Sequence, residues 1–166
     1  MPTAIGRVEQ ALQDIVKAYK GMKQANGYRF NVKLVTRHLR EPDDLDSNLV
    51  PAIFVFRPAG QSEDPRYVDS GISGGYESAL TLHLLGVVRH GGKNPDDASL
   101  ATLAEAFLSD IRALQMKDPR FGSAVVADST LLTGAGNDAA FDSETTVVLQ
   151  PLRVRVNWDI RGTNLP

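Results

Sequence analysis

The stretch from Tyr76 to Leu114 constrains the fold more than any other part of this chain. It begins with an apolar run, SALTLHLLGVV at residues 78–88. A strand whose two faces are both apolar is typical of the middle of a sheet, where at least one face is covered by helices. The alternation places one set of side chains on one face (Leu80, Leu82, Leu84 and Val88) and the other set on the opposite face (Ala79, Thr81, His83, Leu85 and Val87).

Two amphipathic helices are indicated by three- and four-residue steps between apolar side chains. The first follows Thr3, a potential N-cap, and runs to about Met22. The second runs from Pro95 to about Gln115, with Asn94 as its expected cap and Pro95 at its first helical position. These helices supply the apolar faces that cover the sheet.

Further strands are predicted at residues 30–34, 52–56, 125–132 and 145–158, with a bulge or an edge position at Gln150–Pro151 because proline cannot donate to a ladder. The resulting order, α-β-β-β-α-β-β, predicts an α+β two-layer sandwich. We expect a mostly antiparallel sheet of four to five strands with two helices packed on one face. Residues 1–166 are expected to form one domain, with long loops at 38–51, 59–75 and 134–142.

Composition excludes several classes of protein. The net charge of −2 argues against binding nucleic acid by counterion release, which normally needs a basic excess. The chain has no cysteine, so disulfides, thiolate nucleophiles and cysteine-ligated zinc are excluded. It shows neither a signal-peptide pattern nor an apolar run long enough for a membrane span. The sequence therefore predicts a soluble protein without membrane partners that folds in the cytoplasm.

Two glycine-containing segments resemble phosphate-binding motifs. Residues 134–139 match the letters of a dinucleotide fingerprint, but no helix follows them, so we interpret them as a hairpin loop. The loop from His90 to Lys93 precedes a helix and could hold a phosphate with its backbone N–H groups. It lacks the spacing of a P-loop, and Asp96 and Asp97 occupy the helix start. A small phosphate-binding module or enzyme that uses this loop remains a minor alternative.

No catalytic or metal constellation is indicated elsewhere. The three histidines, His38, His83 and His90, lie in different predicted elements without the spacing of metal ligands. No serine lies in a nucleophile-elbow context. We therefore expect a protein that is not an enzyme, with no catalytic residues, no metal and no cofactor.

The features that remain are suited to assembly. Long loops and extended edge strands allow a small α+β subunit to reach its neighbours in a ring, although such loops can equally be plain connections. Exposure and chemistry suggest six contact residues in these regions: Arg66, Tyr67, Arg89, Lys93, Arg153 and Arg155.

The plan of the chain resembles the tail terminator, or tail completion, proteins of long-tailed bacteriophages. An N-terminal amphipathic helix and a strand lead to the proline-led strand VPAIFV at residues 50–55. A long strand, the helix LAEAFLSDIRAL at residues 103–114 and the turn KDPRFG at residues 117–122 follow. The closing strand, LRVRVNW at residues 152–158, completes a resemblance that covers nearly the whole chain.

The resemblance implies a hexameric ring that caps the head-proximal end of a tail tube and ends tube polymerisation. Its partners would be its own copies, the tail tube protein and a neck or head-completion protein, and DNA would pass through the lumen without specific binding. A neck or head-to-tail joining protein of the same particle is the closest alternative. The implied location is the virion, after assembly in the host cytoplasm. The family supplies no catalytic motif, so no residue inherits a catalytic role.

Overall fold

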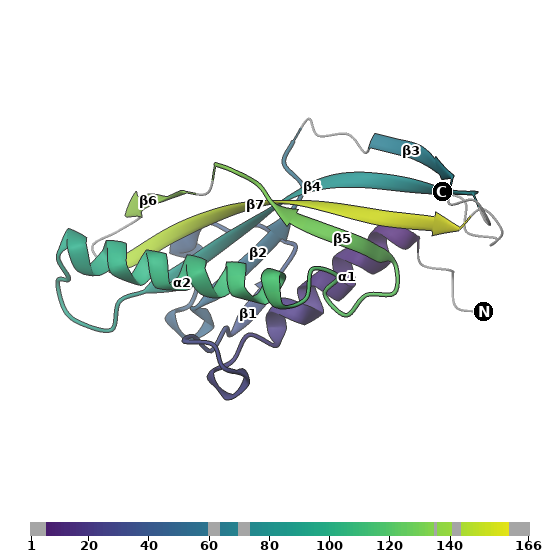
Figure 1. Cartoon of the computed structure of the whole chain (residues 1–166). Helices are drawn as coiled ribbons and strands as arrows, with labels where there is room; N and C mark the ends of the chain where they lie inside the picture. The colour runs from purple at the N-terminus through teal and green to yellow at the C-terminus, as the bar shows by residue number, and fades with distance from the viewer. Residues whose placement is uncertain (1–5, 60–63, 70–73, 135, 141–143, 160–166) are drawn as a thin grey trace.

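The computed structural model describes residues 6–59, 64–69, 74–134, 136–140 and 144–159. For residues 64–69, 74–77, 136–140 and 158–159 it describes the backbone alone. The described chain forms one layer of strands with two helices against it (Figure 1). The expected α+β fold is therefore confirmed.

Two long strands, β4 (Gly74–Arg89) and β7 (Thr145–Asp159), form the centre of the sheet and pair antiparallel along their whole length. Their outer sides each carry two shorter strands in succession. The continuous order is β1-β2-β4-β7-β5, with β3 beside β4 and β6 beside β7. The remaining bounds are β1 (Leu34–Thr36), β2 (Ala52–Phe56), β3 (Asp64–Asp69), β5 (Val126–Leu131) and β6 (Gly136–Ala140). Only the β1–β2 pair is parallel among the described strands.

Both helices, α1 (Arg7–Lys20) and α2 (Asp97–Lys117), pack on the same face of the sheet, as expected. The core joins Ile15 and Tyr19 of α1 and Phe107 and Ile111 of α2 to the inner side chains of the strands. The hydroxyl of buried Tyr19 donates to the carbonyl of Ile111, 3.2 Å away, and so ties the two helices together. The predicted division of β4 is confirmed: Leu80, Leu82, Leu84 and Val88 face the helices, whereas Leu85 and Val87 belong to a second cluster.

The start of α2 lies two residues later than predicted. Asp96, not Asn94, is the N-cap, and its carboxylate accepts a hydrogen bond from the backbone N–H of Ser99 at 2.8 Å. Asn94 has a positive φ of 49° and belongs to the preceding turn. Asp96 is the N-cap because its side chain accepts a hydrogen bond from an N–H group that the first helical turn leaves without a partner.

Two of the predicted loops contain strands. β3 lies within 59–75 and β6 within 134–142. The continuous order has five strands, as expected, and these two described strands are added beside β4 and β7. Aspartate and glycine in both segments, and proline in the first, are depleted in strands and therefore suggested loops. Each becomes a strand because a long central strand offers it a partner: β3 pairs with residues 74–79, and β6 with residues 146–149.

The strand predicted at residues 30–34 forms only from Leu34 to Thr36. Residues 29–33 are held by contacts other than a ladder. The buried carboxylate of Asp110 accepts the backbone N–H groups of Arg29 at 2.7 Å and Phe30 at 3.2 Å. The N–H of Val32 donates to the carbonyl of Met22 at 3.0 Å.

No bulge occurs in the β4–β7 register at Gln150–Pro151, which corrects that prediction. The carbonyl of Pro151 accepts the N–H of Leu132, just beyond the end of β5. Since the N and O atoms of one antiparallel residue point to the same side, the missing N–H of Pro151 faces the junction between β5 and β6. Proline is tolerated there because β5 ends and β6 begins opposite this position, so no ladder hydrogen bond is required from residue 151.

The segment at 38–51, predicted as a long loop, contributes to the core on the helix-free face. It contains two single-turn helices, η2 (Pro42–Asp44) and η3 (Ser47–Leu49), and its buried Leu45 and Val50 cover Phe54 and Val87 on the helix-free face. This cover extends over the β1–β2 end of that face. The polar residues of β7 lie beyond it.

Candidate functional site

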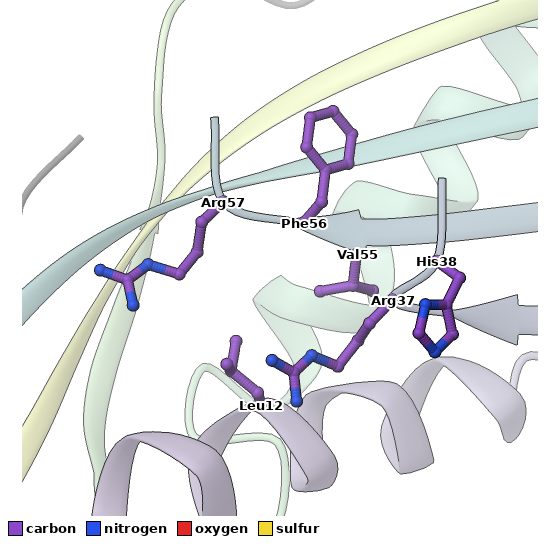
Figure 2. Close-up of a pocket in the computed structure, with 6 residues that line it drawn as sticks. All are labelled: Leu12, Arg37, His38, Val55, Phe56 and Arg57. Atoms are coloured by element: carbon purple, nitrogen blue, oxygen red, sulfur yellow. The ribbon is translucent and has the colours of Figure 1, made fainter. Parts of the chain in front are cut away.

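A groove of about 460 Å³ lies between α1 and the ends of β1 and β2. Its lining residues are Leu12, Arg37, His38, Val55, Phe56 and Arg57 (Figure 2). It forms because β1 pairs with Ala52–Phe54 only, so among the described strands none pairs with the last residues of β2 on that side. After Thr36 the chain bends away, and the threonine hydroxyl accepts the N–H of His38.

Apolar side chains from opposite layers line the groove. Leu12 points from α1 toward β2, and Val55 points from β2 toward α1 (Figure 2). The ring of Phe56 points to the other side of the sheet, where it meets His83 edge to face, with ring centroids 5.6 Å apart. The guanidinium groups of Arg37 and Arg57 extend to the same side of the groove, with Leu12 between them in this view.

One of these arginines forms an ion pair with α1. Nη1 of Arg37 donates to both carboxylate oxygens of Glu9 on α1, each at 2.7 Å. The hydrogen bond from Arg37 is the main cause that holds the pKa of Glu9 below its usual value, and a further bond from Gln13 acts in the same direction. The positive charge of Arg37 at the groove is therefore compensated by the carboxylate of Glu9 on α1.

Sequence reasoning missed this groove. Neither Arg37 nor Arg57 was among the candidate residues. The available signal was that Arg37 closely follows one strand and Arg57 directly follows another. The parallel pairing of β1 with β2 brings the two arginines to the same edge of the sheet. Nothing in the sequence of either strand predicts that pairing.

The six predicted contact residues do not form one cluster. Arg153 and Arg155 lie on the helix-free face of β7, opposite Thr81 and Ala79 of β4. Arg155 is paired with Asp128 of β5, to which its Nε donates at 2.8 Å and its second terminal nitrogen donates as well. This hydrogen bonding is the main cause that lowers the pKa of Asp128. Arg153 is exposed and has no ionic partner among the described residues.

Arg89 and Lys93 lie at the other end of β4 and in the following loop, and both are exposed. Nε of Arg89 donates to the hydroxyl of Thr145 over 3.4 Å. Arg66 and Tyr67 lie on β3, in register with Glu77 and Tyr76 of β4. The described structure thus distributes the six residues over three regions of the sheet.

The loop considered for phosphate binding is closed by its own contacts. Nδ1 of His90 accepts the N–H of Gly92 at 3.0 Å, so this amide is not available to a ligand in this conformation. Hydrogen bonds from Ser99 hold the pKa of Asp96 below its usual value, which keeps a carboxylate at the start of α2. An anionic ligand there would meet like charge. This geometry does not favour the phosphate-binding alternative.

Within the described residues, no group of three or more His, Asp or Glu side chains could hold a metal ion. No described helix is both long and apolar enough to cross a membrane.

No family model matches the chain, and no curated protein matches it. One solved structure that is similar is a chain of the virion of a native gene transfer agent particle. The two chains are 10% identical with a TM-score of 0.41, over 76% of this chain and 80% of that one.

Proposed function

We propose that this protein is a structural component of a phage or phage-like particle that forms a ring, with six copies, at the head-proximal end of the tail tube. The ring would stop the addition of tube subunits and join the tail to the neck. The observation that carries the proposal is the order of elements. This order resembles the plan of the tail terminators. It consists of helix α1, the proline-led strand β2, the long strand β4, helix α2 and the closing strand β7.

The surfaces of the sheet support assembly. Both helices cover one face, and on the other face the cover by residues 45 and 50 reaches only the β1–β2 end. Among the described strands, β3 pairs only with β4, and β5 and β6 pair only with β7, so each leaves an open edge. Open edges and a partly exposed face are surfaces that a neighbouring subunit can cover.

Size and charge are consistent with a ring around DNA. A globule of 166 residues has a radius of gyration of roughly 15 Å, so a channel for a duplex requires several copies. A net charge of −2 limits adhesion of the phosphate backbone to the channel wall.

Of the predicted contact residues, Arg153 is best placed for a contact between subunits, because it is exposed where Arg155 is already bound to Asp128. Arg89 and Lys93 are exposed at the opposite end of β4 and remain further candidates. Arg66 and Tyr67 lie on β3, which pairs only with β4 among the described strands, and they remain candidates through the open edge of that strand.

A tube-capping assay tests this proposal. Purified protein is added to growing tubes of a phage tail tube protein, and tube length and tube ends are recorded by negative-stain electron microscopy. We expect growth to stop and a ring to appear at one end of each tube. Rings that bind the connector but leave tube growth unchanged would favour a neck or head-to-tail joining protein. Unchanged growth with a monomeric protein would contradict the proposal.

A further inference from the structure

A second groove, of about 430 Å³, lies beside α2 at the β5 edge of the sheet. Its described lining comes from Arg112 of α2, Gln150 of β7 and residues 131–134, which end β5 and follow it. Leu131 and Leu132 are half-buried there, and the next two residues are exposed. This groove is therefore accessible from outside the molecule.

Arg112 is held in a fixed orientation at this groove. Its Nε donates to Oε1 of Gln150 at 2.8 Å. Gln150 is 1% exposed, and its amide nitrogen donates to the carbonyls of Leu132 at 3.1 Å and Pro151 at 2.7 Å. The terminal nitrogens of Arg112 form no hydrogen bond or ion pair with any described residue. Because Gln150 is neutral, a half-buried guanidinium is oriented here without being neutralised, which suits a carboxylate from another molecule.

An exposed apolar side chain lies next to Arg112 on α2. Met116 follows one turn later, so the two side chains lie on the same side of the helix, and Met116 is 64% exposed. Lys117 comes next and is also exposed. The nearby carboxylate of Asp118 accepts two backbone N–H groups of its own turn. We define the α2 surface as Arg112, Met116 and Lys117; it combines one apolar and two basic side chains.

A segment of opposite charge follows β1, and we define residues 39–46 as the edge segment. Four exposed carboxylates stand in it against one basic residue, Arg40: Glu41, Asp43, Asp44 and Asp46. None of the four has a hydrogen-bond or ionic partner among the described residues, and they are not grouped to hold a metal ion. Leu39 is 55% exposed, and it and Met116 are the two large apolar side chains that are exposed in the described chain. The edge segment thus matches the α2 surface in charge and in apolar content.

The edge segment and the α2 surface cannot meet within one copy. β1 and β5 stand at the two ends of the strand order, four strand spacings or about 19 Å apart. Leu45 also anchors the edge segment to the helix-free face, whereas α2 covers the other face. A contact between these surfaces must therefore join two copies.

We infer that the edge segment of one copy docks on the α2 surface of a second copy. Its carboxylates accept hydrogen bonds from the terminal nitrogens of Arg112 and from Lys117, and Leu39 packs on Met116. The contact joins two different surfaces, so it is heterologous, and repeated head to tail it closes a ring when the rotation allows it. This inference deepens the proposed function and rests on it, since it assigns the contact that builds the ring.

Charge reversal tests the contact. Arg112→Glu reverses the α2 surface, and Asp43→Lys with Asp44→Lys reverses the edge segment. Either change alone places like charges in every contact, so each should weaken self-association by about tenfold or more in sedimentation velocity. Circular dichroism and unfolding midpoints verify that the variants are folded. If loss of the bond to Gln150 prevents Arg112→Glu from folding, the exposed Lys117→Glu takes its place.

Two combinations distinguish a specific contact from general damage. A chain that carries the reversals of both surfaces has opposite charges in every contact, so it should assemble again. An equimolar mixture of the two reversed chains should form alternating rings, since each mixed contact is complementary. If neither combination assembles although the chains are folded, this inference is wrong.

The apolar part of the contact is tested without a change of charge. Leu39→Ser and Met116→Ser alter side chains that are exposed in the single copy, so neither should shift the unfolding midpoint of the monomer. Each should weaken association by about threefold or more, because apolar area leaves the contact. Unchanged association in both serine variants would contradict the packing of Leu39 on Met116.

Lys17→Glu is the matched control for charge reversal. Lys17 is exposed on α1 and lies outside both surfaces, so its reversal should leave association within about twofold, since distant surface charges are screened. If the unchanged protein does not form rings, the proposed function fails and this inference fails with it. If it forms rings and the reversals of the two surfaces behave like the control, only the contact between the edge segment and the α2 surface fails.

Discussion

At Gly86 the sheet and the helix layer approach too closely for a side chain. A Cβ atom at this position would lie 2.6 Å from Cε1 of Phe107 and 2.8 Å from Cγ2 of Val148. Gly86→Ala should therefore lower the free energy of unfolding by about 1–3 kcal/mol, because the well-packed core must shift. Urea unfolding under conditions that keep the protein monomeric measures this change.

The control for Gly86 is Gly91→Ala, five residues further along the chain. No atom lies within 4 Å of a Cβ placed there. Its effect should stay within about 0.5 kcal/mol, as for most surface substitutions. Equal unfolding midpoints for the two alanine variants would show that close packing at Gly86 does not limit the fold.

Asp110 connects α2 to the segment after α1. Its buried carboxylate accepts two backbone N–H groups, those of Arg29 and Phe30. Asp110→Ala leaves these donors without their partner, and we expect a loss of about 1–3 kcal/mol. Ser109→Ala, at the exposed neighbouring position on α2, should be nearly neutral. Hydrogen exchange of the two amides should accelerate in the Asp110 variant alone.

The Asp128–Arg155 pair predicts a pH effect with a defined sign. Because the folded-state pKa of Asp128 lies below its usual value, the pair stabilises the protein above the unfolded pKa of about 3.9 and loses this effect as pH falls through the folded pKa. Arg155→Met should raise the pKa of Asp128 in an NMR titration. Both groups are more than a third exposed, so the loss of stability at neutral pH should stay below about 1 kcal/mol.

Arg153→Met is the matched variant on the same face of β7. Arg153 has no carboxylate partner among the described residues, so this change should leave the Asp128 titration in place. An equal shift in both variants would mean that general charge, not the specific pair, sets the pKa.

At the scale of elements, the sequence predicted the helices and strands whose apolar periodicity and flanking cap or turn residues lie within the element itself. β2 has the predicted bounds, β5 and β7 differ by a residue or so, and α2 starts two residues late. Parts stabilised by distant partners were not predictable. β3 and β6 depend on pairing with β4 and β7, and residues 29–33 depend on Asp110, about 80 positions away in the chain. The groove depends on the parallel β1–β2 pair for the same reason.

The central strands should also be the most stable elements. β4 and β7 pair with each other and with shorter strands on their outer sides, whereas β1 is a three-residue strand at the end of the order. Amides of Leu82 and Leu152 should therefore exchange only through global opening, and those of β1 through local opening. Native-state hydrogen exchange measures the difference. Equally slow exchange in β1 would contradict this ranking.

At the scale of the whole molecule, the sheet separates two kinds of surface. One face is closed by α1 and α2, and the other carries Arg153 and the Arg155–Asp128 pair beyond the cover of residues 45 and 50. A partly exposed sheet face and open strand edges are surfaces that neighbouring copies can cover in an assembly.

The central claim is that copies of this chain close into a ring. Native mass spectrometry of the purified protein, with electron microscopy of the same sample, tests it most directly. We predict one dominant species with six times the mass of the chain and the shape of an open ring. A protein that keeps the mass of a single chain at every concentration tested would contradict the account.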